Sequence, residues 1–226
     1  TVRLRTGENN ARMSNVDCID QSDLVIEGLL TTSDSTGDLN LSPMGSRIDI
    51  SRKKMVLRPF KTSRSFANLI KTKSGVFHIT DDVNLIARAA VGSIDPWPQM
   101  VQIIDTDVYR LCDTCQWFQL ELASIEQEGE RATLQLNILK MGKVRDFIGF
   151  NRAKHAVIEA AILATRVGIL SDSDITSQME MLRSWVDKTG GVSEHDAYSF
   201  LQQFIIKKIE SVQPTSSSQK NDSSQG

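Results

Sequence analysis

The chain has 226 residues, of which 40% are hydrophobic, and its formal net charge at pH 7 is −2. This length and apolar content suffice for one large domain, or for one medium domain with a smaller appendage. No apolar run approaches the roughly 18 to 20 residues of a membrane span, and the polar first residues lack the apolar segment of a signal peptide. Three cysteines, an odd and small number, argue against a disulfide framework and indicate the reducing cytoplasm.

The first part of the chain reads as an extension followed by short β-rich runs. Residues 1–21 have no clear periodicity, and we expect them to form the extension. The runs that follow are separated by turn residues, which predicts an antiparallel meander; they cover residues 24–32, 39–51 and 53–60. We expect Pro43 and Gly45 to break the second run.

Two short helices and a long hairpin are predicted next. Thr62 or Ser63 supplies an N-cap for a helix over 62–75, and Gly75 is expected to end it. The other predicted elements, in chain order, are a strand at 76–80, a helix at 81–92, a proline-rich loop at 94–100, and a hairpin of alternating strands at 117–125 and 131–141.

The hydrophobic period changes from 2 to 3.6 near residue 144. A helix is predicted within 145–170, with an apolar stripe that contains Phe147, Phe150, His155, Ile158, Ile162 and Leu163. Helices at 172–188 and 194–210 follow, and then a low-complexity polar tail. The fold class is therefore α+β, with a β-rich domain over 22–143, a small all-α domain over 144–211 and a disordered tail over 212–226.

Positive charge is concentrated in one part of the chain. Residues 45–75 hold nine of its 26 cationic residues but one of its 28 acidic residues. A local basic field on an otherwise acidic chain suits a small anionic ligand better than a long nucleic acid, which usually meets a whole basic face. The alternative is a solvated basic edge, which we favour for Arg52, Lys53 and Lys54 at the predicted tip of a hairpin.

Within that region, residues 58–63 read RPFKTS. Pro59 holds Arg58 extended, and the helix that follows presents free backbone N–H groups in its first turn. Those N–H groups, the nearby hydroxyls and an arginine fork can bind a phosphate. The alternative is an N-capped surface helix with scattered cations.

A second segment, NLSPMGSRI at 40–48, is predicted to form a turn between strands. Its backbone amides, the Ser42 hydroxyl and the soft Met44 thioether can border a flat ring, and Gly45 allows a ligand to approach the backbone closely. Because Ser-Pro turns are common, this segment alone is a weak signal.

Taken together, these segments resemble a known family. The strand LVIEGLLTT, the segment NLSPMGSRI, the strand end RPF, the helix start SFANL and the strand VFHITDDV follow one another in the order found in flavin-reductase-like, split-barrel FMN-binding proteins. The chain is most similar to the branch catalogued as domain of unknown function family 447, over residues 24–142. Ser65 departs from the threonine expected before x-x-N-L. The resemblance implies a homodimeric split β-barrel with FMN in clefts at the subunit interface.

The resemblance also implies site residues. It assigns the FMN phosphate to Arg58, Thr62, Ser63 and Ser65, and it places Phe60 in the wall of the cleft. Along the isoalloxazine ring it places Ser42, Pro43, Met44 and Gly45. Asn68 either fixes the loop from within or reaches the ribityl chain. FMN rather than FAD is expected because the chain has one compact phosphate cluster and no G-x-G-x-x-G motif.

Other candidate residues have simpler structural explanations. Cys112 and Cys115 have the spacing of a metal knuckle or a redox pair, but no second pair completes a zinc site. We therefore expect two structural thiols on a strand and no metal. His78, inside an apolar strand, is expected to be a hydrogen-bonded core histidine, and Asp81 and Asp82 are expected to act as helix N-terminal acids.

Two functions of different class remain open on the sequence. One is a flavin-dependent oxidoreductase that passes hydride or electrons to an unknown small substrate, with NADH or NADPH as a transient visitor. The other is a non-catalytic FMN or nucleotide carrier or assembly protein, since the resemblance associates this branch with pterin-linked one-carbon metabolism. We expect a cytoplasmic homodimer without nucleic-acid or membrane partners in either case.

Overall fold

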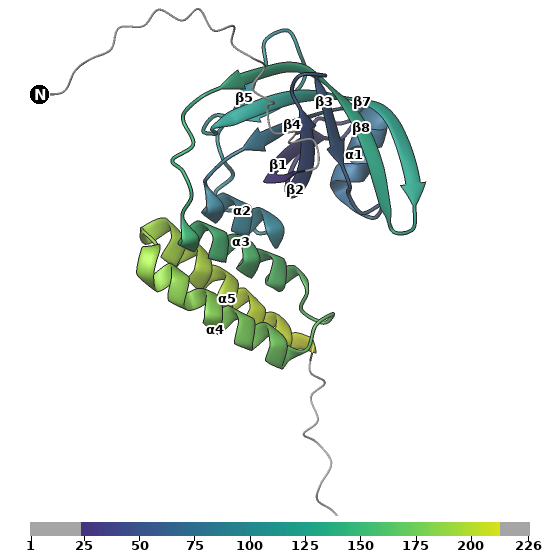
Figure 1. Cartoon of the computed structure of the whole chain (residues 1–226). Coiled ribbons are helices and arrows are strands. Elements are labelled where there is room, and N and C mark those ends of the chain that lie inside the picture. The colour runs from purple at the N-terminus through teal and green to yellow at the C-terminus, as the bar shows by residue number, and fades with distance from the viewer. Residues whose placement is uncertain (1–23, 213–226) are drawn as a thin grey trace, which may run out of the picture.

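The computed structural model describes residues 24–212, so the extension predicted at 1–21 and the tail after residue 212 lie outside the described residues. Six antiparallel strands form a closed barrel in the order β1-β2-β3-β8-β7-β4 (Figure 1). Their bounds are β1 Val25–Ser33, β2 Leu39–Asp49, β3 Lys54–Leu57, β4 Ser74–Ile79, β7 Gln116–Glu128 and β8 Arg131–Lys143. Alternate residues of β8, such as Leu134 and Leu136, fill the barrel interior, as the period of 2 requires. The predicted meander and long hairpin are confirmed.

Strand β2 differs from the prediction, because Pro43 and Gly45 do not break it. Pro43 pairs with Leu29 of β1, whereas pairing with β3 begins only at Ser46. The missing N–H of Pro43 therefore costs no bond of the β2–β3 ladder, and proline is tolerated where a strand has one open side. The expected turn at residues 42–45 is wrong, and these residues form the middle of a continuous strand.

Ser63 is the N-cap of helix α1, Arg64–Thr72, and its hydroxyl accepts a hydrogen bond from the Phe66 N–H at 3.2 Å. Its end differs from the prediction: Lys73 ends the helix in the left-handed conformation with a φ of 60°. Gly75 lies instead in β4, where a Cβ atom would stand 3.0 Å from the carbonyl oxygen of Thr31. Glycine therefore permits close approach of β4 to β1 rather than ending the helix.

Helix α2, Val83–Ala90, begins at Asp82, whose carboxylate accepts from the Leu85 N–H at 3.0 Å. After the proline-rich loop, two strands of three residues each form a small separate sheet, β5 Met100–Gln102 and β6 Tyr109–Leu111. The sequence did not predict this sheet, because three residues are too few to show a period. Among the described residues, no helix combines the length and the apolar character that crossing a bilayer requires.

Three helices end the described chain: α3 Arg152–Thr165, α4 Asp172–Thr189 and α5 Val192–Val212. Helix α3 begins at Asn151, whose side chain accepts from the Lys154 N–H, and its buried face is made largely of alanines rather than of the expected stripe. Phe147 and Phe150 precede the helix and are exposed. The expected helix start is therefore wrong. Of the expected stripe, Leu163 is buried and Ile158 packs against the core, and the alanines allow α3 to pack closely against its neighbours.

The helices and the barrel share one hydrophobic cluster. It joins α2, α3, α4 and α5 to Leu29 and Leu41 on the outer face of β1 and β2, while a second cluster fills the barrel and includes Leu69 of α1. Figure 1 shows α2 lying between the barrel and the three C-terminal helices. An ion pair joins the segment after β8 to the segment between β4 and α2: the Arg145 guanidinium lies 2.5 Å from the buried carboxylate of Asp81.

Candidate functional site

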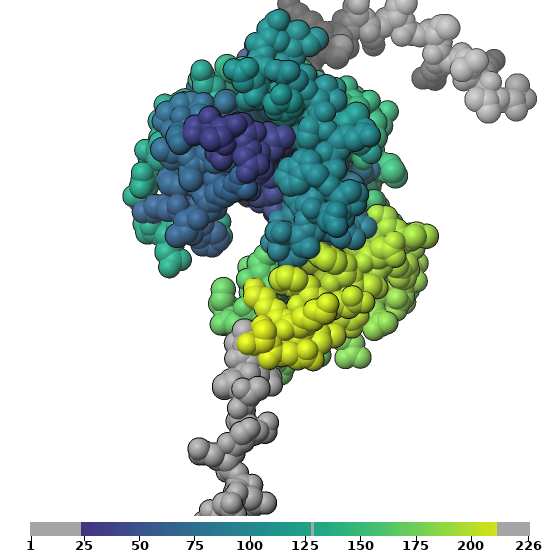
Figure 2. All heavy atoms as spheres, turned by 180° about the vertical axis from the view of Figure 1, so that it is seen from behind, coloured from purple at the N-terminus to yellow at the C-terminus, as the bar shows by residue number. Residues whose placement is uncertain are grey.

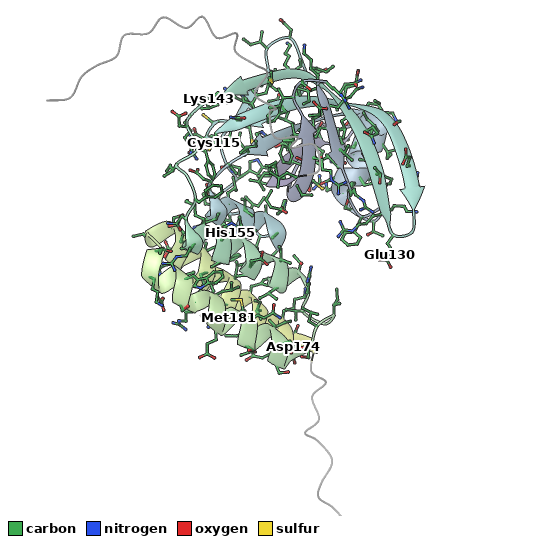
Figure 3. The ribbon with its side chains drawn as sticks, in the orientation of Figure 1. Cys115, Glu130, Lys143, His155, Asp174 and Met181 are labelled. Atoms are coloured by element: carbon green, nitrogen blue, oxygen red, sulfur yellow. The ribbon has the colours of Figure 1, made fainter. Side chains whose placement is uncertain are left out.

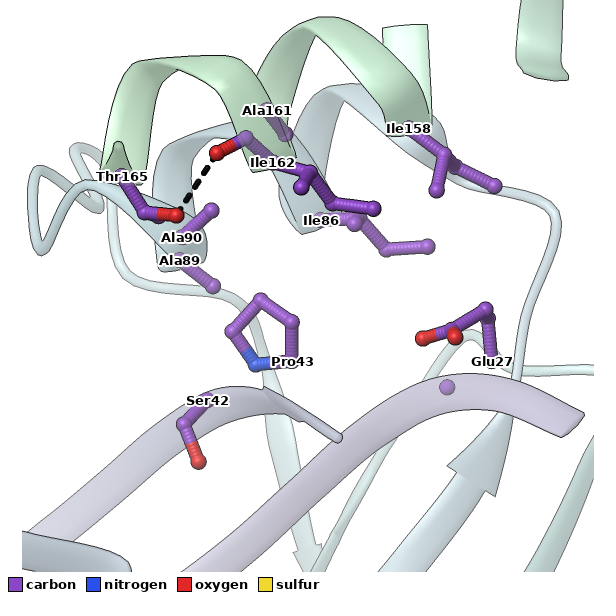
Figure 4. Close-up of a pocket in the computed structure, with 11 residues that line it drawn as sticks. Glu27, Ser42, Pro43, Ile86, Ala89, Ala90, Ile158, Ala161, Ile162 and Thr165 are labelled. Carbon is purple, nitrogen blue, oxygen red and sulfur yellow. Dashed lines mark hydrogen bonds between the residues drawn. The ribbon is translucent and has the colours of Figure 1, made fainter. Parts of the chain in front are cut away.

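A cavity of about 280 Å³ lies where the outer face of β1 and β2 meets α2 and α3. Its lining is mainly apolar and is formed by Pro43, Ile86, Ala89, Ile158, Ala161 and Ile162. Its polar margin contains Glu27, Ser42 and Thr165. Figure 4 shows the Pro43 ring and the Glu27 carboxylate directed into the space below α2 and α3. From the other side, Figure 2 shows a hollow between the barrel segments and the C-terminal helices. A concave apolar site with few polar groups is typical of a small-molecule site.

Strand β2 separates the predicted ring-binding residues onto two faces. Pro43 faces the cavity, while the Ser42 hydroxyl points away from it (Figure 4). That hydroxyl lies 2.6 Å from the Ser65 hydroxyl of α1, and Met44 packs against the barrel interior. Gly45 lies opposite Glu27 in the β1–β2 register. Of the residues at 42–45, the side chain of Pro43 reaches the cavity because successive side chains of a strand point to opposite faces.

The RPFKTS segment is held in place by the turn between β7 and β8, at the end of the barrel labelled Glu130 in Figure 3. The Lys61 N–H donates to the Glu130 carbonyl, and the Ala132 N–H donates to the Pro59 carbonyl, both at 3.0 Å. The guanidinium of Arg131 donates to the Arg58 carbonyl at 2.9 Å and lies 3.9 Å from the centre of the Phe60 ring. The conformation of this segment is therefore set by residues of a distant hairpin.

The cations of this segment are not equivalent. Arg64 is paired with Asp38 at 2.6 Å, whereas Arg58 is exposed and its guanidinium has no carboxylate partner within residues 24–212. Thr62 is also exposed, and Ser63 caps α1. Arg58 and Thr62 are therefore free to meet an anion, while the charge of Arg64 is already neutralised.

Two predicted residues are buried and serve to join elements. The Ser65 hydroxyl accepts from the Asn40 amide at 3.0 Å and also contacts Ser42. The Asn68 amide donates to the Thr32 hydroxyl at 3.1 Å, which matches the expectation that Asn68 fixes this region from within. These contacts hold the start of α1 against β1 and β2, beside the strand that lines the cavity.

The start of α1 suits a phosphate. The first backbone N–H groups of a helix have no acceptor within it, and in the described chain those of Arg64 and Ser65 have none elsewhere. They follow Arg58, Lys61 and Thr62 directly in the chain. Anions are stabilised at such a terminus by oriented N–H groups and by the helix dipole. The residues present therefore fit the phosphate end of FMN, and the apolar cavity suits part of a flat ring.

Glu27 brings negative charge to the cavity. Partial burial and the negative charge of Glu159 on α3 raise the pKa of the Glu27 carboxyl above its usual range. Glu27 was not among the residues that the sequence predicted. An isolated glutamate in a strand gives no local signal, because its surroundings come from α2 and α3.

The other candidates have structural roles. His78 accepts from the Leu111 N–H through Nε2 at 3.0 Å, and its Nδ1 faces the Leu29 carbonyl at 3.1 Å, so the predicted core histidine is confirmed. Its burial lowers the pKa to about 4. Cys112 and Cys115 lie in the loop between β6 and β7 rather than on a strand. Within the described chain, no cluster of three or more histidine, cysteine or acidic residues could hold a metal.

Asp81 and Asp82 differ in role. Asp82 caps α2 as predicted. Burial acts to raise the pKa of Asp81, but the hydrogen bonds from Arg145 and from the Ile148 N–H, together with the positive charges of Arg145 and Lys154, hold the pKa below its usual range. Asp81 is therefore half of a buried ion pair, which the expectation of a simple helix-terminal acid did not foresee.

The closed antiparallel barrel followed by helices defines the class of the protein as a split β-barrel, so the predicted fold class is confirmed. The family model "Protein of unknown function (DUF447) N-terminal domain" matches residues 26–145, and the model "Protein of unknown function (DUF447)" for the C-terminal domain matches residues 151–203. The chain belongs to this DUF447 family, as the sequence resemblance predicted. No curated protein matches the chain.

One solved structure has the same fold over most of this chain. An FMN-bound DUF447 protein from Methanosarcina mazei is 21% identical, with a TM-score of 0.69 over 80% of this chain and 94% of that chain. The flavin reductase of styrene monooxygenase from Pseudomonas putida S12 is 15% identical, with a TM-score of 0.45 over 54% and 82% of the two chains. A protein with a split barrel domain from Shewanella frigidimarina is 13% identical, with a TM-score of 0.46 over 53% of this chain and 67% of that chain.

Proposed function

We propose that this protein binds FMN, with the phosphate at the start of α1 and the ring along β2. The observation that carries the proposal is the contact between Ser42 and Ser65, which holds the phosphate-compatible start of α1 beside the strand that lines the cavity. The FMN bound to the family member from Methanosarcina mazei supports this choice of cofactor.

In this proposal each predicted residue has a physical task. Arg58 supplies a fixed positive charge, Thr62 supplies a neutral donor, and the N–H groups of Arg64 and Ser65 bind phosphate oxygens. Ser63 and Asn68 hold the helix start in place. Phe60, whose ring is half exposed, would form part of the cleft wall. Gly45 and Pro43 would border the ring. Ser42 and Met44 lie on the opposite face of β2, where Ser42 contacts Ser65 and Met44 packs against the barrel core.

We also propose that the protein is a homodimer with the cofactor at the subunit interface. The cavity volume of about 280 Å³ lies at the lower end of small-molecule sites, so a second subunit would be needed to cover a ligand as large as FMN. Self-association is supported by exposed apolar residues on β8 and the segment after it, because soluble monomers rarely expose large contiguous apolar patches. These residues are Leu139, Met141, Phe147, Ile148 and Phe150.

The activity we propose is oxidation or reduction of a small substrate, with NADH or NADPH as a transient electron donor. Bound FMN would supply the redox chemistry, and the protein would orient it and tune its electronics. The second candidate is a flavin or nucleotide carrier or assembly protein without turnover, including one linked to pterin-dependent one-carbon metabolism. Cytoplasmic location stays a prediction.

Two measurements test these proposals. Purified protein should have the yellow absorption of a flavin, and chromatography after denaturation should identify FMN. FAD, or no flavin even after reconstitution with excess FMN, would contradict the cofactor. Rapid mixing of the flavin-loaded protein with NADH or NADPH then separates the functions, because bleaching of the flavin is expected of an oxidoreductase and not of a carrier.

A further inference from the structure

The RPFKTS segment continues the strand pairing of the barrel toward the turn between β7 and β8. Leu57 of β3 pairs with Leu134 of β8. Three residues further along, Phe60 forms a bridge with Arg131, so the same antiparallel register continues. Residues directly opposite one another on antiparallel strands place their side chains on one face. Phe60 and Arg131 are therefore a cross-strand pair, and Arg58, two residues before Phe60, is exposed on the same face.

The Arg131 guanidinium makes two contacts with this segment at once. Its central carbon lies 3.9 Å from the centre of the Phe60 ring, and its Nη1 group donates a hydrogen bond to the Arg58 carbonyl at 2.9 Å. A planar guanidinium permits both contacts, because it can stack on an aromatic ring while its N–H groups point outward in its own plane. The Phe60 ring therefore orients the donor, and the donor holds the backbone of Arg58.

Arg131 differs in kind from the other links between the hairpin and this segment. The hydrogen bonds from Ala132 to Pro59 and from Lys61 to Glu130 join backbone groups, so they do not depend on which side chains are present. The link from Arg131 does depend on its side chain. A segment that is already ordered loses less conformational freedom when a ligand binds, and this pre-organisation raises affinity.

We propose that Arg131 is a positioning residue of the phosphate site, which acts through Arg58 and makes the protein select a phosphorylated flavin over riboflavin. By holding the Arg58 backbone, Arg131 limits the positions open to the Arg58 guanidinium and favours those within reach of a phosphate at the start of α1. The hairpin end labelled Glu130 in Figure 3 then belongs to the cofactor site. This inference rests on the proposed function, because it concerns the FMN phosphate.

The test is a titration of flavin-free full chain with FMN and with riboflavin. Arg131→Met keeps the apolar part of the side chain and removes its donors. It should weaken FMN about fivefold, within the usual coupling of neighbouring residues, and leave riboflavin within about twofold. Arg131→Lys should lose nearly as much, because an ammonium keeps the charge but cannot stack flat and donate in the same plane. Lys140→Met removes an exposed cation toward the other end of β8 and should change the affinity for neither flavin.

A double-mutant cycle tests whether Arg131 acts through Arg58. In the Arg58→Ala background, Arg131→Met should weaken FMN by less than about twofold, because the side chain that it positions is gone. The full fivefold loss in that background, or unchanged FMN affinity in Arg131→Met or Arg131→Lys, would overturn the proposal. Equal losses for FMN and riboflavin would also overturn it, by showing that Arg131 only stabilises this end of the barrel. A wild-type protein that does not prefer FMN to riboflavin would instead contradict the proposed phosphate site, and this inference with it.

Discussion

Replacing Arg58 by alanine tests the phosphate site most directly. The guanidinium is exposed and has no carboxylate partner among residues 24–212, while the Arg58 backbone is held by Pro59 and by the hydrogen bond from Arg131. Arg58→Ala therefore removes a charge and leaves the segment in place. A charged hydrogen bond contributes about 1.5–3 kcal/mol. Because the site is exposed and screened by solvent, we expect the lower half of that range, a loss of roughly tenfold in FMN affinity.

The assay is a titration of flavin-free protein with FMN and with riboflavin, which has the same ring and no phosphate. Arg58→Ala should weaken FMN and hardly change riboflavin. Arg64→Ala is the matched control, since Arg64 is already paired with Asp38 at 2.6 Å, and Thr62→Ala should cost less than Arg58→Ala because water can partly replace a neutral donor. Equal losses for both flavins would mean that Arg58 shapes the barrel, and no loss for either would identify this segment as a solvated helix start.

Three further predictions concern stability and assembly. His78 is protonated near pH 6.5 in the unfolded chain but only near its pKa of about 4 in the folded protein. The free energy of unfolding should therefore fall by about 3 kcal/mol as the pH is lowered from 6.5 to 4. Urea unfolding of His78→Gln should lack this pH dependence, whereas His155→Asn, at an exposed histidine, should keep it. Arg145→Met should destabilise the fold by about 2 kcal/mol in the same assay, because it leaves the Asp81 carboxylate buried and without its ion-pair partner. The control is Arg183→Met, which removes an exposed ion pair with Asp187 at 4.0 Å and should cost far less. Light scattering at micromolar concentration should give twice the chain mass of 25.2 kDa, and a monomer with FMN still bound would contradict the dimer.

Elements whose signals are local could be predicted from the sequence. The alternation in β7 and β8 predicted a half-buried hairpin. Thr62 or Ser63, and the acids Asp81 and Asp82, predicted helix starts, because a cap depends on residues three positions apart. His78 could be recognised as a core residue from its apolar neighbours. The order of motifs from β1 to β4 was enough to predict the split barrel and the family.

Which of these residues lie together depends on contacts between segments far apart in the chain. Whether Pro43 breaks a strand depends on where pairing with β3 begins, and that register is set by residues outside the segment. Arg131 reaches Phe60 and Arg58 only because the β7–β8 hairpin folds back along the chain. The cavity beside Glu27 takes its walls from β1, β2, α2 and α3. Contacts between residues so distant in sequence leave no periodicity or short motif, since they arise when the barrel closes and the helices pack against it.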